Sequence, residues 1–209
     1  MSTDKDWKKW GKDEPYFGVF SNKKYRNENL TSEVLNEFFK SGEDHVCNLI
    51  ELIQNNLGEE LKLNSVLDFG CGVGRLAIPF SKISSNTIGI DISDHMIRIA
   101  EQNTFDRNIK NLNFFLSVKK LDFIKNKFSL VHSYIVFQHI PPKRGYEIIF
   151  DLADKVDKNG VLAVHILTSI NANKFKRFLV TLQNTTPTMV VEFSKETPFF
   201  RATYATSCL

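Results

Sequence analysis

The sequence has few of the residues that mark secreted, zinc-binding or membrane proteins. Its 209 residues include three cysteines, Cys47, Cys71 and Cys208, which are far apart and form no Cys-x-x-Cys pair. Neither a disulfide framework nor a zinc site is therefore indicated, and we expect no metal. No segment approaches the roughly 20 consecutive apolar residues of a membrane span, and the first residues carry no apolar signal core. These absences predict a protein of a reducing compartment, with a cytoplasmic localisation.

A concentrated basic surface is also missing. The net charge is only +3, with a sequence pI of about 8.7, and Lys and Arg are spread along the chain. Nucleic-acid binders usually gather these charges on one face, so the pattern argues against nucleic acid as a partner. The hydrophobic content of 42% is enough for one domain with a substantial core.

Short apolar segments alternate with helical patterns from residue 65 onward. We predict strands at 65–69, 87–90, 112–116, 128–136 and 161–166, with helices at 75–84, 94–103 and 142–156. A helix is predicted at 32–57, bent or split at Gly42. Beyond residue 166 we predict a short helix at 173–182 and a strand pair at 189–193 and 199–204. This order predicts an α/β fold with a doubly wound, mainly parallel sheet and helices on both faces.

A glycine-rich turn follows the first of these strands and reads Asp68-Phe69-Gly70-Cys71-Gly72-Val73-Gly74. Glycine allows sharp turns with positive φ and lets the backbone approach a ligand closely, while the next helix directs its N-terminal N–H groups at that ligand. Dinucleotide sites usually read G-x-G-x-x-G, whereas the spacing here is G-x-G-x-G after an acid. The departure argues against a pyrophosphate ligand. Cys71 is interpreted as a small filler of the loop.

An acid also ends the next predicted strand, in the segment Ile90-Asp91-Ile92-Ser93. A carboxylate in this position can accept hydrogen bonds from both hydroxyls of a ribose. The alternative is that Asp91 only caps the following helix. Ile92 and Met96 would flank an adenine ring, and for Met96 a role in the core is the competing interpretation.

Together with the stretch from Phe128 to Pro142 and the last strand, these motifs resemble those of class I S-adenosylmethionine-dependent methyltransferases over residues 65–166. The resemblance implies a Rossmann-like sheet of the seven-stranded type, here abbreviated at the C-terminal strands, and S-adenosyl-L-methionine as the cofactor. It implies an N-terminal aromatic segment with helices covering the site over residues 1–60, and a cofactor-binding domain over 61–209. The implied cofactor-binding residues are Asp68, Gly70, Cys71, Gly72, Gly74, Arg75, Asp91, Ile92, Met96, Ser117, Val118 and Gln138.

The chain departs from the family pattern after the third strand, where an acid near the adenine amino group is often found. Here Ser117 or the Val118 backbone would replace it, since Asp122 lies further along. The chain also ends soon after Tyr204, so its substrate side is expected to be short or truncated.

His139 is the best candidate for a general base, because it follows the fourth strand near the expected methyl donor and its ordinary pKa lies near neutrality. Its alternative role is a hydrogen bond to backbone at a helix start. His132 is predicted to be a core residue, His165 a weaker site candidate, and His45 and His95 surface or helix residues. The N-terminal aromatics Trp10, Tyr16, Phe17, Phe20 and Tyr25 are expected to fold over the cofactor and shape the acceptor pocket, or alternatively to pack against the first helix. For the acceptor itself we expect contacts from Trp10, Tyr16, Phe17, Tyr25 and His139.

We therefore predict a methyltransferase acting on a small molecule, for example on a sugar or metabolite hydroxyl. The Asp/Asn-Pro-Pro-aromatic signature of amino-directed nucleic-acid methyltransferases is absent. The segment Ile140-Pro141-Pro142-Lys143 matches it only in part. Two alternatives stay open. One is a non-catalytic binding protein of the same fold, and the other is an NAD-dependent oxidoreductase.

Overall fold

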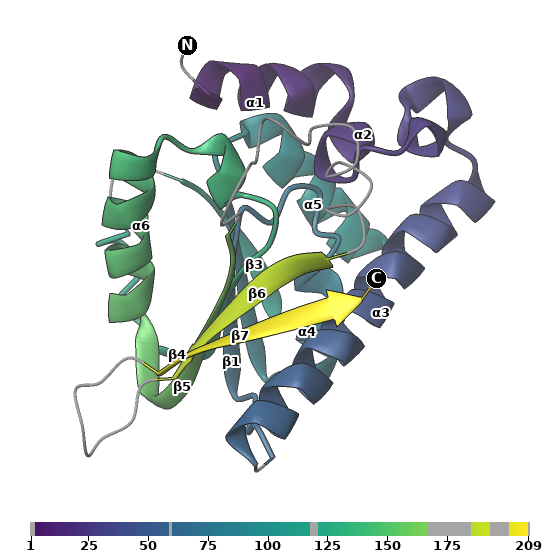
Figure 1. The fold of residues 1–209 in the computed structure, drawn as a ribbon. Coiled ribbons are helices and arrows are strands. Elements are labelled where there is room, and N and C mark those ends of the chain that lie inside the picture. The colour runs from purple at the N-terminus through teal and green to yellow at the C-terminus, as the bar shows by residue number, and fades with distance from the viewer. Residues whose placement is uncertain (1–2, 59, 118–120, 167–184, 193–200, 209) are drawn as a thin grey trace.

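The computed structural model of the protein describes residues 3–58, 60–117, 121–166, 185–192 and 201–208 (Figure 1). The helices are α1 (Thr3–Asp13), α2 (Pro15–Val19), α3 (Ser32–Leu57), α4 (Ala77–Ile83), α5 (Asp94–Asp106) and α6 (Pro142–Asp154), with 3-10 turns η1 (Lys23–Tyr25), η2 (Asn27–Asn29) and η3 (Phe137–His139). The strands are β1 (Ser65–Phe69), β2 (Asn86–Asp91), β3 (Leu112–Leu116), β4 (Phe128–Ser133), β5 (Val156–His165), β6 (Thr185–Glu192) and β7 (Arg201–Cys208).

The strands form one sheet in the order β3-β2-β1-β4-β5-β6-β7. The first five strands are parallel, and β6 and β7 add to the β5 edge as an antiparallel pair. The strand order reverses between β1 and β4, which lie side by side. Ligands of open α/β sheets bind at the carboxyl ends of the strands, at this kind of switch point. The predicted fold class, a doubly wound and mainly parallel sheet, is confirmed.

Helices cover both faces of the sheet (Figure 1). On one face, α3 and α4 pack on β1, β4 and β5 through an apolar cluster that includes Ile53, Phe80 and Leu130. The first half of α3 joins α4 and α5 in a second cluster on the same side. On the other face, α6 packs Leu152 on Val131 and its neighbours. Burial on both faces explains why the central strands read as nearly continuous apolar runs.

Helix α3 runs without interruption from Ser32 to Leu57, so the predicted split at Gly42 is wrong. Its start is capped by Thr31, whose hydroxyl accepts a hydrogen bond from the Val34 amide. The glycine serves a close contact instead, because a Cβ at position 42 would lie 2.1 Å from the Arg75 carbonyl oxygen. Helix α3 therefore packs directly against the segment that follows the glycine loop.

The N-terminal segment contains helices that the weak apolar periodicity did not predict. Helices α1 and α2 lie over the end of the sheet at which β1 and β2 terminate (Figure 1). Gly11 permits close packing there, because a Cβ at this position would lie 2.1 Å from Ser93 Oγ at the start of α5. An ion pair of 2.6 Å between Asp4 and Arg144 connects α1 to α6. The segment thus covers the carboxyl edge of the sheet.

Most predicted boundaries differ from the observed ones by a few residues. Strand β4 ends at Ser133 rather than at residue 136, because the chain turns at Ile135, which has a φ of 60°. The terminal strands are longer than predicted, and both are present in the sheet. The helix predicted at 173–182 lies outside the described residues.

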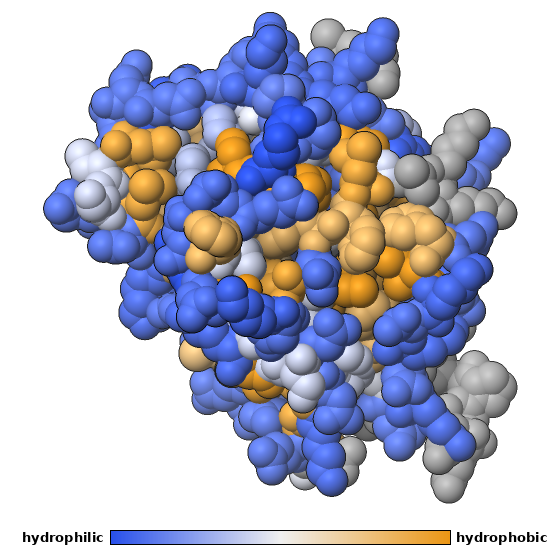
Figure 2. Space-filling model, turned by 180° about the vertical axis from the view of Figure 1, so that it is seen from behind, coloured by the Kyte–Doolittle hydropathy of each residue, from blue (hydrophilic) through white to orange (hydrophobic). Residues whose placement is uncertain are grey.

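Apolar side chains gather on the face of the molecule shown in Figure 2, with hydrophilic residues around them. The large apolar side chains that are exposed in the structure include Phe115 and Leu116, at the end of the edge strand β3, and Phe123.

None of the helices in the described ranges is long and apolar enough to cross a membrane.

Candidate active site

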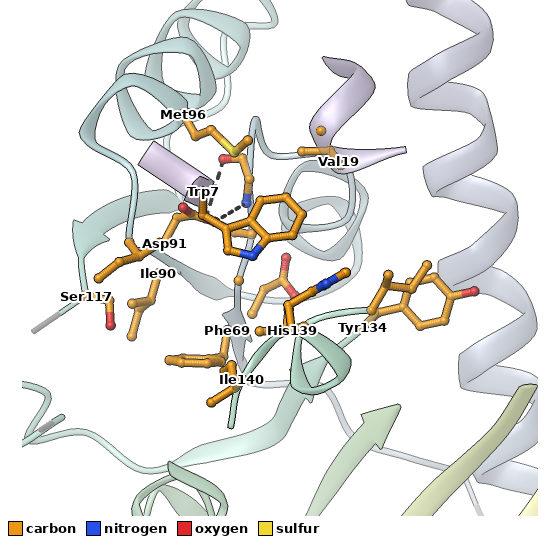
Figure 3. Close-up of a pocket in the computed structure, with 18 of the residues that line it drawn as sticks. Trp7, Val19, Phe69, Ile90, Asp91, Met96, Ser117, Tyr134, His139 and Ile140 are labelled. Atoms are coloured by element: carbon orange, nitrogen blue, oxygen red, sulfur yellow. Dashed lines mark hydrogen bonds between the residues drawn. The ribbon is translucent and has the colours of Figure 1, made fainter. Parts of the chain in front are cut away.

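A cavity of about 410 Å³ lies where β1, β2 and β4 end, beneath α1 and α2 (Figure 3). This volume falls in the usual range for small-molecule and cofactor sites, roughly 300–1,000 Å³. Its floor is the glycine loop, and Trp7 of α1 points into it from above. Of the predicted cofactor residues, those that line it are Asp68, Gly70, Cys71, Gly72, Arg75, Asp91, Ile92, Met96, Ser117 and Gln138.

The glycine loop has the conformation that its spacing predicts. Gly70, Gly72 and Gly74 all have positive φ, at 79°, 54° and 88°. The amides of Gly70 and Cys71 both donate to the Ile90 carbonyl, which fixes the loop to β2. A Cβ at Gly70 would lie 2.2 Å from Val136 Cγ2. Gly70 and Gly72 therefore form a cradle that side chains would fill, while Gly74 faces the core and does not line the cavity.

Asp68 is buried at one end of this cradle, with 2% of its surface exposed. Its Oδ1 lies 2.8 Å from His132 Nδ1. Its Oδ2 is buried and has no hydrogen-bond partner within the described part of the chain. A buried acceptor without a donor is destabilising by about 1–3 kcal/mol, so this oxygen marks a place for a ligand that donates hydrogen bonds.

The buried guanidinium of Arg75 lines the same end of the cavity. Its Nη1 donates to Ser41 Oγ at 3.2 Å, and its Nε is unpartnered among the described residues. The carboxyl of Asp68 and the guanidinium of Arg75 together suit a zwitterion, because each can meet the opposite charge of an amino-acid group.

Asp91 lies at the end of β2 and holds the loop from the opposite side. Its Oδ2 accepts a hydrogen bond from the Gly72 amide at 2.9 Å, and its Oδ1 accepts one from the Ser93 amide at 2.8 Å. Burial raises the pKa of Asp91 to about 6, although the hydrogen bonds from Ser93, Gly72 and Ile92 act in the opposite direction. The cap of α5 is Ser93, whose hydroxyl accepts from the Met96 amide. Asp91 therefore does not serve as the helix cap, and each of its oxygens keeps acceptor capacity toward the cavity.

The region expected to hold an adenine ring is mostly apolar. Ile90, Ile92 and Met96 line it, and the Met96 side chain also belongs to the core cluster between α3 and α5. Both interpretations of Met96 therefore apply. Ser117 lines the cavity as well, and its amide donates to the Asp91 carbonyl at 2.7 Å. Val118 lies outside the described residues.

Gln138 and His139 form the last turn before α6 and line the other side of the cavity. The His139 ring is edge-on to the Trp7 indole, with ring centroids 4.7 Å apart (Figure 3). Burial lowers the pKa of His139, so the imidazole is neutral at pH 7 and can accept a proton. Gln138 Nε2 and His139 Nε2 lie 3.1 Å apart.

A second, more open groove of about 470 Å³ adjoins the cavity and shares Trp7, Gln138 and His139 with it. Trp10 and Phe17 line this groove, with their ring centroids 5.6 Å apart. Two of the four N-terminal aromatics expected at the acceptor thus line the same groove as His139.

Tyr16 and Tyr25 are placed elsewhere, so their predicted contact with an acceptor is corrected. Tyr25 is only 1% exposed and packs edge-on against Phe38 of α3. The Tyr16 ring also packs on Phe38, and its hydroxyl donates to Asn103 Oδ1 at 3.1 Å. Neither lines the cavity or the groove. The apolar face of α3 attracts both rings, which is the alternative stated from the sequence.

Cys71, His165 and His45 form part of the packing. Burial raises the pKa of the Cys71 thiol well above its ordinary value, which agrees with its interpretation as a filler. His165 is buried next to Tyr134 and does not line the cavity, and burial lowers its pKa to about 4. His45 lies on α3, but its ring packs against Tyr134 rather than facing solvent. His95 is at the surface as predicted.

The sequence did not single out several residues that line the cavity. These are Thr3, Asp4, Trp7, Val19, Tyr134 and Arg144, whereas Phe20, which also lines the cavity, was among the aromatics expected to cover it. Most belong to the N-terminal helices, where periodicity was weak, and only the density of aromatic residues indicated that region. Among the described residues, no group of three or more His, Cys, Asp or Glu side chains is arranged to hold a metal.

Comparison with known proteins agrees with this architecture. The sequence model of the methyltransferase domain family matches residues 66–160, which hold the glycine loop, Asp91 and His139. The chain is 38% identical over 87 residues to the release factor glutamine methyltransferase of Buchnera aphidicola, a match of 40% of this chain and 31% of that protein. It is 31% identical over 123 residues to the ribosomal protein L11 methyltransferase of Lactobacillus johnsonii, covering 57% of this chain and 36% of the relative. The chain thus spans about a third of the length of these relatives.

Two solved structures share the fold at low sequence identity. Magnesium protoporphyrin IX methyltransferase from Synechocystis PCC 6803, with bound S-adenosylmethionine, superposes with a TM-score of 0.57 at 17% identity, covering 99% of this chain and 98% of the other. An S-adenosylmethionine-dependent methyltransferase from Clostridium acetobutylicum has a TM-score of 0.52 at 18% identity, with coverage of 81% and 73%. Residues 66–160 thus match the methyltransferase domain family, and the chain shares the fold of these two S-adenosylmethionine-dependent enzymes.

Proposed function

We propose that this protein binds S-adenosylmethionine in the cavity and transfers its methyl group to a small molecule. The observation that carries the proposal is the pair of buried carboxyl groups at either end of the glycine cradle. Asp68 has a buried oxygen without a donor, and Asp91 presents acceptor oxygens at the end of β2. The molecule that fits has an ammonium group at one end and ribose hydroxyls at the other.

The side chains present suit the parts of this cofactor in order along the cavity. Asp68 would accept hydrogen bonds from the α-ammonium, and Arg75 would pair with the α-carboxylate. Asp91 would accept from the ribose hydroxyls, and the adenine would lie among Ile90, Ile92 and Met96, beside Ser117. When bound, the cofactor supplies a methyl group already activated by the sulfonium charge.

His139 and Trp7 would act at the methyl end. Neutral His139 would take the proton from an acceptor hydroxyl as the new bond forms, or from an acceptor ammonium before the attack, because only the free amine has a lone pair for the methyl group. Trp7 would exclude water and restrict the acceptor to an in-line approach, since orientation supplies up to roughly 7–11 kcal/mol of barrier reduction in favourable cases. For an acceptor that is already a free nucleophile, only the orienting role applies.

The acceptor is proposed to enter through the groove lined by Trp7, Trp10 and Phe17. Its aromatic walls suit a flat ring or the apolar face of a sugar, and its position beside His139 is that required for the reacting atom. The N-terminal segment within residues 1–60 is proposed to cover the site, which favours a small acceptor. The two relatives named above are described as acting on proteins, so a protein acceptor is the competing outcome of the test.

Binding is tested first, by thermal shift with S-adenosylhomocysteine and with NAD. A ligand that binds the folded state raises the unfolding temperature by mass action. We expect a shift with S-adenosylhomocysteine and none with NAD; the reverse pattern would reject the cofactor assignment and favour an oxidoreductase.

Transfer is tested next, by release of S-adenosylhomocysteine on incubation with S-adenosylmethionine and cell extract. The extract is divided into a small-molecule filtrate, a protein fraction and an RNA fraction. We expect turnover with the filtrate. Turnover confined to protein or RNA would reject the small-molecule acceptor, and binding without turnover in any fraction would favour a non-catalytic binding protein.

A further inference from the structure

The buried pair of Asp68 and His132 links the cofactor cradle to the centre of the sheet. The two residues are direct register neighbours on the parallel strands β1 and β4. Asp68 Oδ1 and His132 Nδ1 lie 2.8 Å apart, and both side chains are no more than 3% exposed. Since a carboxylate only accepts hydrogen bonds, the Nδ1 atom of His132 is the donor.

The His132 ring is held from several sides, so this donor has a fixed direction. The Phe80 ring of α4 packs edge-on at 5.0 Å, His45 of α3 lies at 5.9 Å, and the Tyr134 ring stacks at 6.5 Å. Rotation of the imidazole would require movement of two helices. The bond therefore fixes the rotation of the Asp68 carboxyl about its Cβ–Cγ axis.

Fixing Oδ1 also determines where the second oxygen lies. Oδ2 is the buried atom without a donor, on a residue that lines the cavity. Without His132, the Asp68 carboxyl group could rotate, and either oxygen could face the cavity. A cofactor ammonium group would then have to orient the carboxyl group as it binds. Groups that are already oriented bind more tightly, because this ordering is not required at the moment of binding.

We propose that His132 is a positioning residue for the cofactor, acting through Asp68 on the amino-acid end alone. This inference rests on the proposed function, since it assumes that an amino-acid group occupies the cavity beside Asp68. His132 itself does not line the cavity. A purely structural role would predict a general loss of stability that affects every part of the ligand equally.

The test compares two ligands that share the adenosine part. S-adenosylhomocysteine has the amino-acid end, and 5′-methylthioadenosine lacks it. Dissociation constants are measured by calorimetry for the wild type, His132→Leu, His132→Asn and Asp91→Asn. Leucine has a side chain of similar volume to histidine but cannot donate a hydrogen bond to Asp68. The amide of asparagine can donate one from near the position of His132 Nδ1.

We expect His132→Leu to weaken S-adenosylhomocysteine about tenfold, which is the lower range for a hydrogen bond to a charged group. Binding of 5′-methylthioadenosine should change less than about twofold, since nothing it contacts is altered. His132→Asn should recover most of the loss. Asp91→Asn should weaken both ligands and serves as the control for the shared adenosine part.

Equal weakening of both ligands in His132→Leu, or no recovery in His132→Asn, would overturn the proposal. If the wild type itself binds neither ligand, the proposed function has failed, and this result is distinct. A second measurement needs no variant: nitrogen-detected NMR of the wild type should show His132 protonated at Nδ1, with a shift change on adding S-adenosylhomocysteine but not 5′-methylthioadenosine. Protonation at Nε2, or the same response to both ligands, would contradict the assignment.

Discussion

The raised pKa of Asp91 predicts that cofactor affinity and the stability of the ligand-free protein depend on pH in opposite directions. Ribose hydroxyls donate to an ionised carboxylate more strongly than to a protonated one. Burial raises the pKa of this group to about 6. Affinity for S-adenosylhomocysteine should therefore be constant above pH 7 and decrease as the pH is lowered through 6.

The size of the effect follows from the ionised fraction. With a pKa of about 6, roughly 97% of Asp91 is ionised at pH 7.5 and roughly 9% at pH 5, so affinity should fall about tenfold over that interval. The free energy of unfolding of the ligand-free protein changes with pH in the opposite direction. The folded state binds the proton more tightly than the unfolded state, so between about pH 4 and 6 the free energy of unfolding decreases as the pH rises, by at most about 3 kcal/mol.

Both quantities are measured on one protein with Asp91→Asn as the control. Calorimetric titrations at half-unit steps from pH 5 to 8 give the dissociation constant, and urea unfolding of the ligand-free protein over the same range gives the stability. The asparagine variant cannot titrate at this position, so both pH dependences should flatten, and its affinity at pH 7.5 should be lower by about tenfold or more. A wild-type affinity that stays constant from pH 8 to 5, or the same slope in the variant, would refute the reasoning.

Three further outcomes are expected. Gly70→Ala should lower the free energy of unfolding by about 2–4 kcal/mol in urea titration and abolish S-adenosylhomocysteine binding, because it combines a positive φ with a 2.2 Å clash against Val136; wild-type binding would show that the loop tolerates a side chain. His139→Gln should reduce kcat by about 10²–10⁴-fold with an unchanged dissociation constant for S-adenosylhomocysteine. In the wild type at saturating cofactor, kcat should fall in acid at a lower pH than an unperturbed histidine would give, because burial lowers the pKa of His139; an unaltered kcat in the variant excludes it as the base. Gly11→Ala should separate α1 from Ser93 and change tryptophan fluorescence, whereas an unchanged spectrum would mean that the contact is absent.

The central sheet and the glycine cradle could be predicted because their signals are local. Glycine spacing after Asp68 and the acid at the end of the next strand depend on neighbouring residues alone, and the parallel order then brings Asp91 to the loop. Buried strands with apolar runs are similarly easy to recognise.

The side of the cavity that α1 covers could not be predicted in the same way. Trp7 reaches His139 across more than a hundred residues of sequence, and the position of α1 depends on two distant contacts, Gly11 with Ser93 and Asp4 with Arg144. Tyr25 was expected at the acceptor but packs on Phe38 of α3. Aromatic character alone does not distinguish a residue that packs in the core from one that faces a ligand. Periodicity reports which face of an element is apolar, but not which partner covers it.

The contact at Gly42 has a consequence for how this sequence can vary. Any larger residue at the middle of α3 would press on the Arg75 carbonyl, and Arg75 lies at the end of the glycine loop that forms the cavity floor. A position that never touches a ligand thereby limits the range of substitutions that this helix can accept. Mutant libraries of α3 that aim at higher stability should keep Gly42 unchanged. Screens for altered ligand affinity should include the neighbours of Gly42, because substitutions there can change the cavity without touching the ligand.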